Sequence, residues 1–416
     1  MTFRAQLLFF AVIALFGSVV SAQQPAWRSL PLQDSPDLPA PVPRGSNPAP
    51  SDAENTLLAS FDRYEVVGMS AAHGNKDLDD FILHLLRNPA FPGKVNDVVV
   101  ECGNSLYQPT LDRYIAGGDV PVTEVREIWR NTTQPMCGLS AFYQELFPLI
   151  RRINQRLPPE KKLRVLAGDP PIDWSKIRSA RDFGQGQFLM QRDVSIASVM
   201  EREVLAKHRK ALMLFGTAHL FHVGDTAVGL YEKHYPGVTL VIADHTGFGN
   251  WTPFAKYNNS FEARLDLWPV PSLVVKLQGT WLADLLDQTY STGNVMFGVI
   301  DSGKVPAGPI SPKGTFAHVP PQAQSKFSAM VDAYLYLGPR DLLLHEPTPA
   351  EVVLDQDYMA ELQRRAALIG EGPIADQTNR DKIAERDANR FFYDPDELRK
   401  FLKPPSSLSP QPRPQN

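Results

Sequence analysis

The chain has 416 residues, with 42 Lys or Arg against 46 Asp or Glu, so its formal net charge is −4. This near balance of charges, without a basic run, excludes the usual patterns of nucleic-acid binding and of attachment to anionic lipid. We therefore expect a globular protein whose partner is a small-molecule ligand or substrate. The sequence does not predict an oligomeric state.

The N-terminus has the pattern of a secretion signal. Arg4 precedes an apolar run from Leu7 to Val20, and the small residues Val20-Ser21-Ala22 precede Gln23. The apolar run is too short for a stable membrane span. We expect residues 1–22 to be removed, which leaves 416 − 22 = 394 residues, 41 basic and 46 acidic groups, and a charge of −5. The mature protein is then expected to lack a transmembrane anchor and to be periplasmic or secreted.

The composition predicts flexible ends around one folded region. Residues 23–50 and 403–416 are rich in Pro, Ser and Gln and have too little apolar content to fold. Residues 51–402 are expected to form a single α/β domain, with a mainly parallel sheet flanked by helices. A helical insertion at about residues 105–160 is expected to form a cap or lid over this sheet.

Residues 65–101 are expected to form the βαβ unit around which the sheet is built. The apolar pair Val66-Val67 leads into a small-residue loop with His73, and an amphipathic helix follows. A second apolar run, Val98–Val100, stops at Glu101. Ligands bind outside the carboxyl ends of such parallel strands, so His73 and Glu101 are expected to face one crevice.

The rest of the chain adds strands and helices to this unit. Helical patterns cover Tyr107–Ile115, Val122–Trp129, Ser140–Leu157 and Phe188–His208, and apolar runs at Leu163–Ala167, Ala211–Phe215, Val238–Ala243 and Ala333–Leu337 predict strands. The segment from Ala350 to Leu402 is helical and charged, which is more typical of a scaffold than of a site. His345-Glu346, before a proline, is expected to be structural.

A titratable residue lies at or shortly after the end of most predicted strands. These residues are His73, Glu101, Asp169, His219, Asp244 and His245. Turn formation and helix capping explain the two aspartates well. They explain poorly a Glu after three valines, and two histidines in the small-residue loops SAAH and GTAH. We therefore interpret His73 and His219 as candidate catalytic or ligand-binding residues.

These residue types suit acid–base chemistry. A His can act as a general base near neutral pH, and Glu101 can orient an imidazole, stabilise its cation or act as the base itself. Arg192 has a planar fork of donors that suits a carboxylate or a developing oxyanion. A divalent metal held by His73, Glu101 and His219 is an alternative, and His222 follows His219 at a ligand-like spacing. The chain has no HExxH or CxxC motif that would support the metal hypothesis.

Cys102 and Cys137 are the only cysteines. In an oxidising compartment they can pair, and a disulfide would then fix the loop after the strand that carries Glu101. The alternative is a buried Cys102 and a free thiol at Cys137. Sequence alone does not give the separation that a disulfide requires.

The order of four short motifs resembles a known superfamily. SAAHGN follows the first strand, VVVE ends the next, RDVSIA starts a helix, and GTAH follows a later strand. Together they are similar to the superfamily that joins erythromycin esterases, ChaN-like haem-binding proteins and Tiki/TraB proteins. The WRN segment, the aromatic helix around Tyr143 and RVLAGDPP look most like the first two branches. The resemblance covers about residues 60–245.

The resemblance implies that His73, Glu101, Arg192 and His219 occupy the site. The esterase branch implies metal-free hydrolysis with His73 as the base, the Tiki branch a divalent metal, and the ChaN branch haem. The family usually has Gly-Glu-x-His where this chain has Ser70-Ala71-Ala72-His73, so one carboxylate is absent. Three hypotheses follow: an exported hydrolase acting on an ester or amide, a haem- or iron-binding protein without catalysis, or a member whose site has lost its chemistry.

Overall fold

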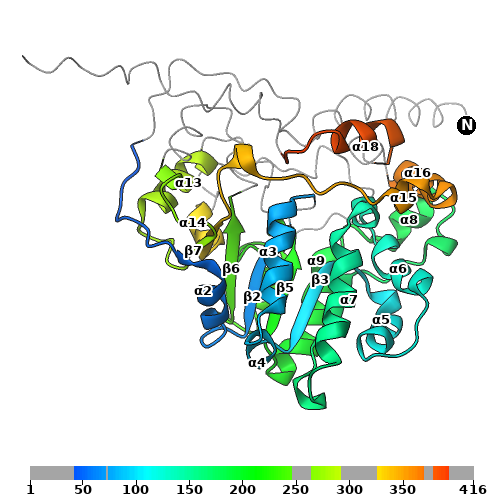
Figure 1. Ribbon diagram of the computed structural model, residues 1–416, viewed down its shortest axis with the longest axis horizontal. Coiled ribbons are helices and arrows are strands. Elements are labelled where there is room, and N and C mark those ends of the chain that lie inside the picture. Colours follow the sequence, from blue (N-terminus) through cyan, green and yellow to red (C-terminus); the bar gives the residue numbers. More distant parts are fainter. Residues whose placement is uncertain (1–41, 72–73, 246–263, 292–325, 370–377, 393–416) are drawn as a thin grey trace, which may run out of the picture.

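The computed structural model describes residues 42–71, 74–245, 264–291, 326–369 and 378–392. Within these ranges the chain forms one mixed sheet with helices on both faces (Figure 1). Every helix in the described ranges is too short or too polar to span a bilayer. The predicted leader, residues 23–50, is too long, because Ser46 already exchanges backbone hydrogen bonds with Gly279 and Trp281. The predicted secretion signal lies outside the described residues.

In the part of the chain that the structure describes, the sheet has eight strands in the spatial order β1-β7-β8-β6-β2-β5-β3-β4. Their bounds are β1 Ser51–Asp52, β2 Val66–Ser70, β3 Asp97–Asn104, β4 Arg164–Asp169, β5 Ala211–Phe215, β6 Thr239–Asp244, β7 Ser272–Val274 and β8 Ala333–Tyr336. Strand β7 is antiparallel to both neighbours, and the other pairs are parallel. The predicted fold class, a mainly parallel α/β sheet flanked by helices, is confirmed.

Alternate residues of the strands pack against two separate helical layers. Val98 and Val100 point into one layer, whereas Val99 points into the other. The first layer holds α2 Ala53–Ser60, α3 Lys76–Arg87, α4 Phe91–Lys94, α5 Gln108–Ile115, α6 Val122–Arg130 and α7 Phe142–Asn154. The second holds α9 Arg192–Val199, α10 Thr217–Leu220, α11 Ala227–Tyr231, α13 Trp281–Ser291 and α14 Phe327–Met330. Because both faces are covered, the strands read as continuous apolar runs.

Two predicted features differ from the structure. Helices α5 to α7 bury their apolar side chains in the core beside α3, so the predicted insertion is part of a main layer rather than a separate lid. The predicted helix Phe188–His208 begins only at Arg192 and passes into a π-helical turn at Met200–Val204 and a 3-10 turn at Leu205–Lys207. Arg192 is therefore the first residue of α9.

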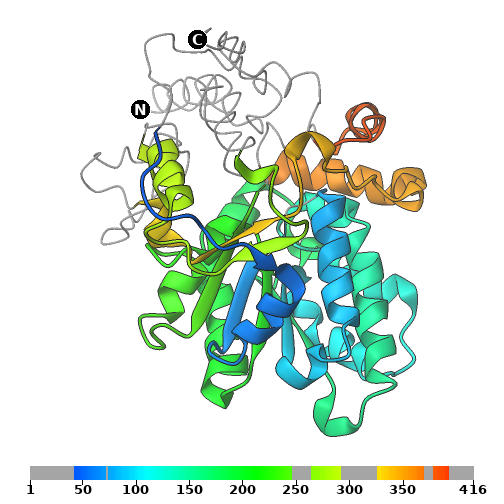
Figure 2. The ribbon, with the colours of Figure 1, turned by 60° about the vertical axis from the view of Figure 1, so that its left-hand side comes forward.

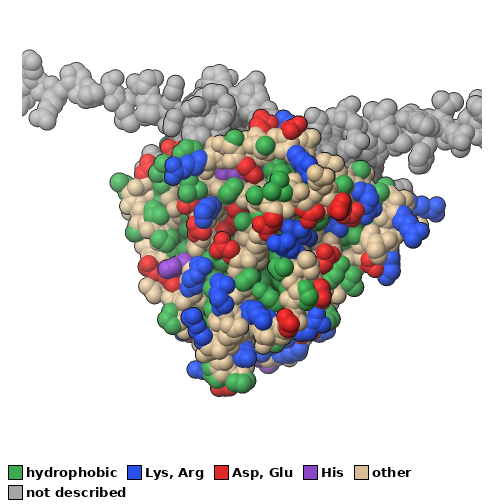
Figure 3. Space-filling model, turned by 45° about the vertical axis from the view of Figure 1, so that its right-hand side comes forward, with side chains coloured by type: hydrophobic (Ala, Val, Ile, Leu, Met, Phe, Trp, Pro, Cys, Tyr) green, Lys and Arg blue, Asp and Glu red, His purple; other side chains and the backbone are tan. Residues whose placement is uncertain are grey.

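The remaining helices are α8 Ala180–Gly186, α15 Ala350–Leu354, α16 Gln356–Ile369 and α18 Arg380–Asp387. In both ribbon views α16 and α18 lie beyond the end of the sheet near which α3 begins (Figure 2). Lys and Arg side chains are interspersed with Asp and Glu over the face in Figure 3.

Two side-chain amides cover the free edge of β4. Asn154 donates to Leu163 O and accepts from Leu163 N, each at 2.8 Å. Gln108 donates to Val165 O at 2.9 Å and accepts from Ala167 N at 2.8 Å. Four outward-facing backbone groups along this edge are thus paired much as a further strand would pair them.

Cys102 and Cys137 form a disulfide, with their Cα atoms 5.4 Å apart. Of the two alternatives left open by the sequence, pairing is therefore confirmed. The bond joins β3, one residue after Glu101, to the 3-10 turn Pro135–Leu139. It fixes the connection between β3 and α7 beside the carboxyl ends of the strands.

Replacing both cysteines with serine is expected to lower the free energy of unfolding by about 3 to 4 kcal/mol, because the bond closes a long loop in the unfolded chain. Chemical denaturation of the double variant and of the oxidised wild type measures the difference. Wild type treated with a thiol reductant serves as the control and should match the variant. A loss below about 1 kcal/mol would contradict the expected constraint.

Candidate functional site

Glu101 is aimed into the site by an irregularity in β3. The strand does not stop at Glu101, as the sequence predicted, but continues to Asn104. Its register with β4 shifts between Val100 and Asn104, and such bulges re-aim side chains. Gly103 is required there, since a Cβ atom would lie 2.9 Å from Ala167 Cα. Glu101 is only 3% exposed.

Strand β5 brings His219 beside Glu101. It lies between β2 and β3, so the two strands of the predicted βαβ unit are not direct neighbours. After β5, the backbone N–H of Gly216 donates to Glu101 Oε2 at 2.5 Å. A Cβ atom on Gly216 would lie 3.3 Å from that oxygen, so the glycine permits the close approach. His219 follows in the short helix α10.

Arg192 joins the predicted residues into one buried network. Its Nη2 donates to Glu101 Oε1 at 2.7 Å, and its Nε donates to Asp169 Oδ1 at 2.9 Å. Its Nη1 lies 3.2 Å from His219 Nε2. The predicted meeting of Glu101, Arg192 and His219 at the carboxyl ends of the strands is therefore found. Described residues engage three of the five N–H groups of Arg192, which leaves at most two for an oxyanion.

The partners of His219 define its tautomer. Because a guanidinium can only donate, His219 Nε2 must accept from Arg192. The proton is then on Nδ1, which lies 2.8 Å from Asp193 Oδ1. Asp193 is itself held by the backbone N–H of Ala227 at 2.7 Å. His219 is thus oriented from both sides, and its Nε2 lone pair is not open to a water in this arrangement.

Burial and charge act in opposite directions on the network. Burial raises the pKa of Asp169, while Arg192 and two hydrogen bonds from Thr133 oppose that rise. Burial lowers the pKa of Arg192, but the carboxylates of Glu101 and Asp169 outweigh it and hold that pKa above its ordinary value. Arg192 therefore stays cationic, and its charge is matched by carboxyl groups from two different strands.

His73 lies outside the described residues. The residues around it are described: Ser70 is the last residue of β2, and Asn75 caps α3 by accepting from Asp77 N and Leu78 N. The role of His73 stays a prediction, as does a metal held by His73, Glu101 and His219. Within the described residues, no group of three or more His, Cys, Asp or Glu side chains could hold a metal ion.

The other histidines are engaged elsewhere. His222 does not join His219 as a second ligand, because its two ring nitrogens contact Glu232 Oε2 and Asp332 Oδ2, each at 2.7 Å. His245 Nδ1 lies 2.6 Å from the hydroxyl of Tyr334, and His345 Nε2 lies 3.0 Å from Asp387 Oδ1.

Sequence reasoning missed the roles of Asp169 and Asp193. Asp169 was explained as a turn former, yet its carboxylate binds Arg192 and Thr133. Asp193 directly follows Arg192, but adjacency alone does not indicate that it contacts an imidazole 26 residues away. In the sequence, the available indication for Asp169 was its place between a predicted strand and two prolines.

Comparisons with known proteins show distant likeness in structure alone. No protein-family model and no curated protein matches the sequence. A Bacillus cereus protein superposes with a TM-score of 0.40 and 11% identity, over 73% of this chain and 95% of the other. The type III effector HopBA1 gives 0.32 and 13%, over 49% and 89%. ChaN of Campylobacter jejuni, a protein with cofacial haem binding, gives 0.30 and 12%, over 46% and 86%. At these low TM-scores the α/β fold is established by the strand pairing itself.

His222 should make stability depend on pH. Burial lowers its pKa, but the contacts with Asp332 and Glu232 outweigh burial and raise the pKa to about 9 from 6.5. A raised folded-state pKa stabilises the protein fully below pH 6.5, and that contribution is lost as the pH rises through 9. His222→Gln is therefore expected to cost about 3 kcal/mol at low pH and little in strong alkali.

Urea unfolding of wild type and His222→Gln across this pH range measures the effect. His234→Gln is the matched control, because the imidazole of His234 pairs with Glu201 and the side chain is 71% exposed. A cost of His222→Gln that stays the same at every pH would contradict the expected linkage.

Proposed function

We propose that the protein is an exported hydrolase that activates water on an ester or amide, with His73 as the base. The observation that carries this proposal is the buried guanidinium of Arg192, bound by Glu101 and Asp169 and contacting His219 at the carboxyl ends of the strands. This edge is where ligands bind in parallel α/β sheets.

Stability alone does not explain the buried charges of Arg192, Glu101 and Asp169. Removing charges from water costs several kcal/mol per ion, and apolar residues of similar volume often serve a core equally well or better. Arg192, Glu101 and Asp169 are nevertheless 6%, 3% and 0% exposed. Buried charge arranged with displaced pKa values is more typical of functional sites.

The charges around the site favour a protonated, cationic histidine during the reaction. Glu101, Asp169 and Asp193 supply three carboxyl groups around one guanidinium, Arg192. Such a surplus of carboxyl groups stabilises an imidazolium, which is what a histidine becomes when it takes a proton from water. The same surplus disfavours anionic substrates, so the proposed substrate is a neutral or cationic ester or amide.

The described residues have supporting roles in this proposal. His219 Nε2 accepts from Arg192, so His219 orients and supports rather than acting as the first base. The two unengaged N–H groups of Arg192 are available to a developing oxyanion. The base then has to come from the loop after β2, where the sequence places His73.

Export is part of the proposal. It is supported by the signal-like N-terminus and by the disulfide between Cys102 and Cys137, because disulfides persist mainly in oxidising compartments.

The test is turnover of matched neutral, cationic and anionic chromogenic esters by the purified mature protein. His73→Ala is expected to lower kcat/KM by about 100- to 10,000-fold, the usual contribution of a general base. Neutral or cationic esters should be turned over faster than anionic ones, and a chelator should leave the rate unchanged. His208→Ala is the control, because the side chain of His208 is 85% exposed and contacts Glu65.

Turnover that survives His73→Ala would reject the proposed base. Turnover that a chelator abolishes and zinc restores would instead favour a metal site. A Soret band on adding haem, without turnover of any ester, would favour a haem-binding protein of the ChaN type over a hydrolase.

A further inference from the structure

The segment Leu344–Glu346 is hydrogen-bonded to the chain between β2 and the first turn of α3. Glu346 N donates to Gly74 O at 2.8 Å, and Lys76 N donates to Leu344 O at 2.9 Å. Leu344 N donates to Asp77 Oδ2 at 2.6 Å. These hydrogen bonds join residues about 270 positions apart and attach the segment to the first turn of α3. His345-Glu346 is therefore structural, as predicted, but it lies at the candidate site.

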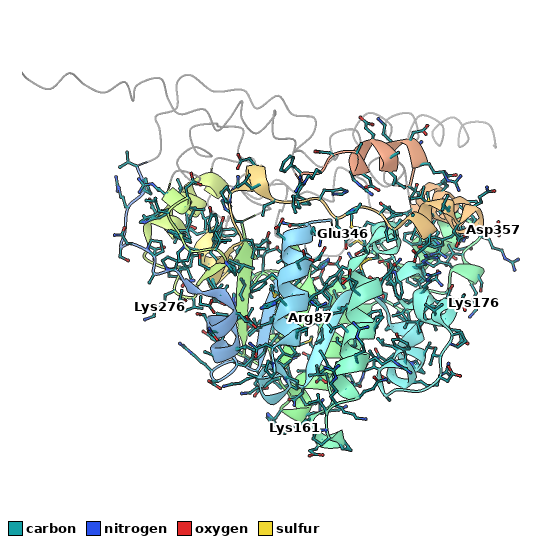
Figure 4. The ribbon with its side chains drawn as sticks, in the orientation of Figure 1. Arg87, Lys161, Lys176, Lys276, Glu346 and Asp357 are labelled. Carbon is teal, nitrogen blue, oxygen red and sulfur yellow. A yellow bond between two sulfur atoms is a disulfide. The ribbon has the colours of Figure 1, made fainter. Side chains whose placement is uncertain are left out.

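Two carboxyl groups are buried where this segment meets α3, and each acts electrostatically on the other. Asp79, in the first turn of α3, is 7% exposed, and Glu346 is 9% exposed. Figure 4 shows Glu346 at the end of α3 where that helix begins. Glu346 Oε2 accepts a hydrogen bond from Ser140 Oγ at 3.2 Å, as a carboxylate does. Asp79 Oδ2, in contrast, has no hydrogen-bond partner among the described residues.

The surroundings of Asp79 disfavour its ionised form. Burial raises its pKa well above the ordinary value, and Glu346 of the bound segment raises it further. Asp80 on the same helix and Glu145 on α7 act in the same direction. Among the described residues, the cation that opposes them is Lys76, and its Nζ pairs with both oxygens of Asp80.

Tyr143 connects this acid pair to the network around Arg192. Its side chain is 1% exposed and lies beside the backbone of Cys102. Burial raises the pKa of Tyr143, and the nearby carboxyls of Glu101, Asp79 and Glu346 raise it further. Three carboxyl groups, from β3, α3 and the segment Leu344–Glu346, thus act on one hydroxyl. The arrangement is stable when at least one of these acids is neutral.

We propose that Asp79 is a neutral acid in the folded protein and that its proton holds the segment Leu344–Glu346 on the first turn of α3. When Asp79 ionises, its Oδ2 is a buried charge without a hydrogen-bond partner among the described residues, and the carboxylate of Glu346 repels it. The least costly relief is to release the segment, which carries Glu346 into water. Asp79 is in this sense a positioning residue for the loop after β2, and it acts through Glu346 rather than on a substrate.

The sign of the pH dependence follows from linkage. Because the pKa of Asp79 is higher in the folded than in the unfolded protein, its proton stabilises the bound segment at pH values below the ordinary carboxyl range. That stabilisation is lost as the pH rises through the folded-state pKa. Asp79→Asn keeps a neutral side chain of the same shape at every pH, and it should therefore abolish the loss.

The experiment compares hydrogen exchange of wild type and Asp79→Asn at matched pH, in the peptides that contain residues 74–80 and 342–347. Above the pKa of Asp79, the ratio of the exchange rate in wild type to the rate in the variant should rise with pH. The rise is at most about tenfold per pH unit, the limit for the loss of one proton. Asp62→Asn is the control, since the side chain of Asp62 is 64% exposed, pairs with Lys94 and is not among the groups that act on Asp79, and it should behave as wild type. Glu346→Gln should bring the ionisation of Asp79 to lower pH.

Carboxyl-carbon NMR of wild type tests the same point without a variant. The proposal is supported if Asp79 titrates clearly above the ordinary aspartate range. It is overturned if Asp79 titrates within that range, or if wild type and Asp79→Asn exchange with the same pH dependence. None of these measurements requires turnover, so the proposal can fail or succeed independently of the proposed hydrolysis.

Discussion

The guanidinium of Arg192 is the group on which the rest of the site depends. It contacts residues that follow or belong to three strands, namely Glu101, Asp169 and His219. A buried cation of this kind is tolerated only if its partners are in place, because losing one of them leaves an uncompensated charge in the interior. The bulge in β3, the glycine after β5 and the start of α9 each serve this requirement. The site and the fold therefore constrain each other.

Much of the scaffold was predictable from the sequence. Buried parallel strands are continuous apolar runs, and Ala211–Phe215 was located with its bounds as found because its neighbours are a lysine and a glycine. Glu101, Arg192 and His219 were predicted to meet because the carboxyl ends of parallel strands share one edge of the sheet. That argument needs only the direction of each strand. It does not need the spatial order of the strands, which is why it succeeded although β5 separates β2 from β3.

What the sequence could not predict depends on contacts between distant segments. Asp193 looks like an ordinary first-turn acid of α9, and only its position beside His219 gives it a role. Glu346 precedes a proline, and the sequence predicted only a structural role for it. Its placement follows from backbone pairing between residues 74–77 and 344–346, which leaves no periodic pattern in either stretch. Buried ionisable groups likewise have no signature of their own in a sequence.

The covered edge of β4 has a consequence for how copies of this protein can associate. An open strand edge invites another chain to continue the sheet, and this is a common route to swapped dimers and fibrils. Here Asn154 and Gln108 occupy the positions that an incoming backbone would take. The opposite border ends in β1, which has only two residues, Ser51 and Asp52. Within the described residues, sheet growth is therefore hindered at one border by these two amides and at the other by the shortness of β1.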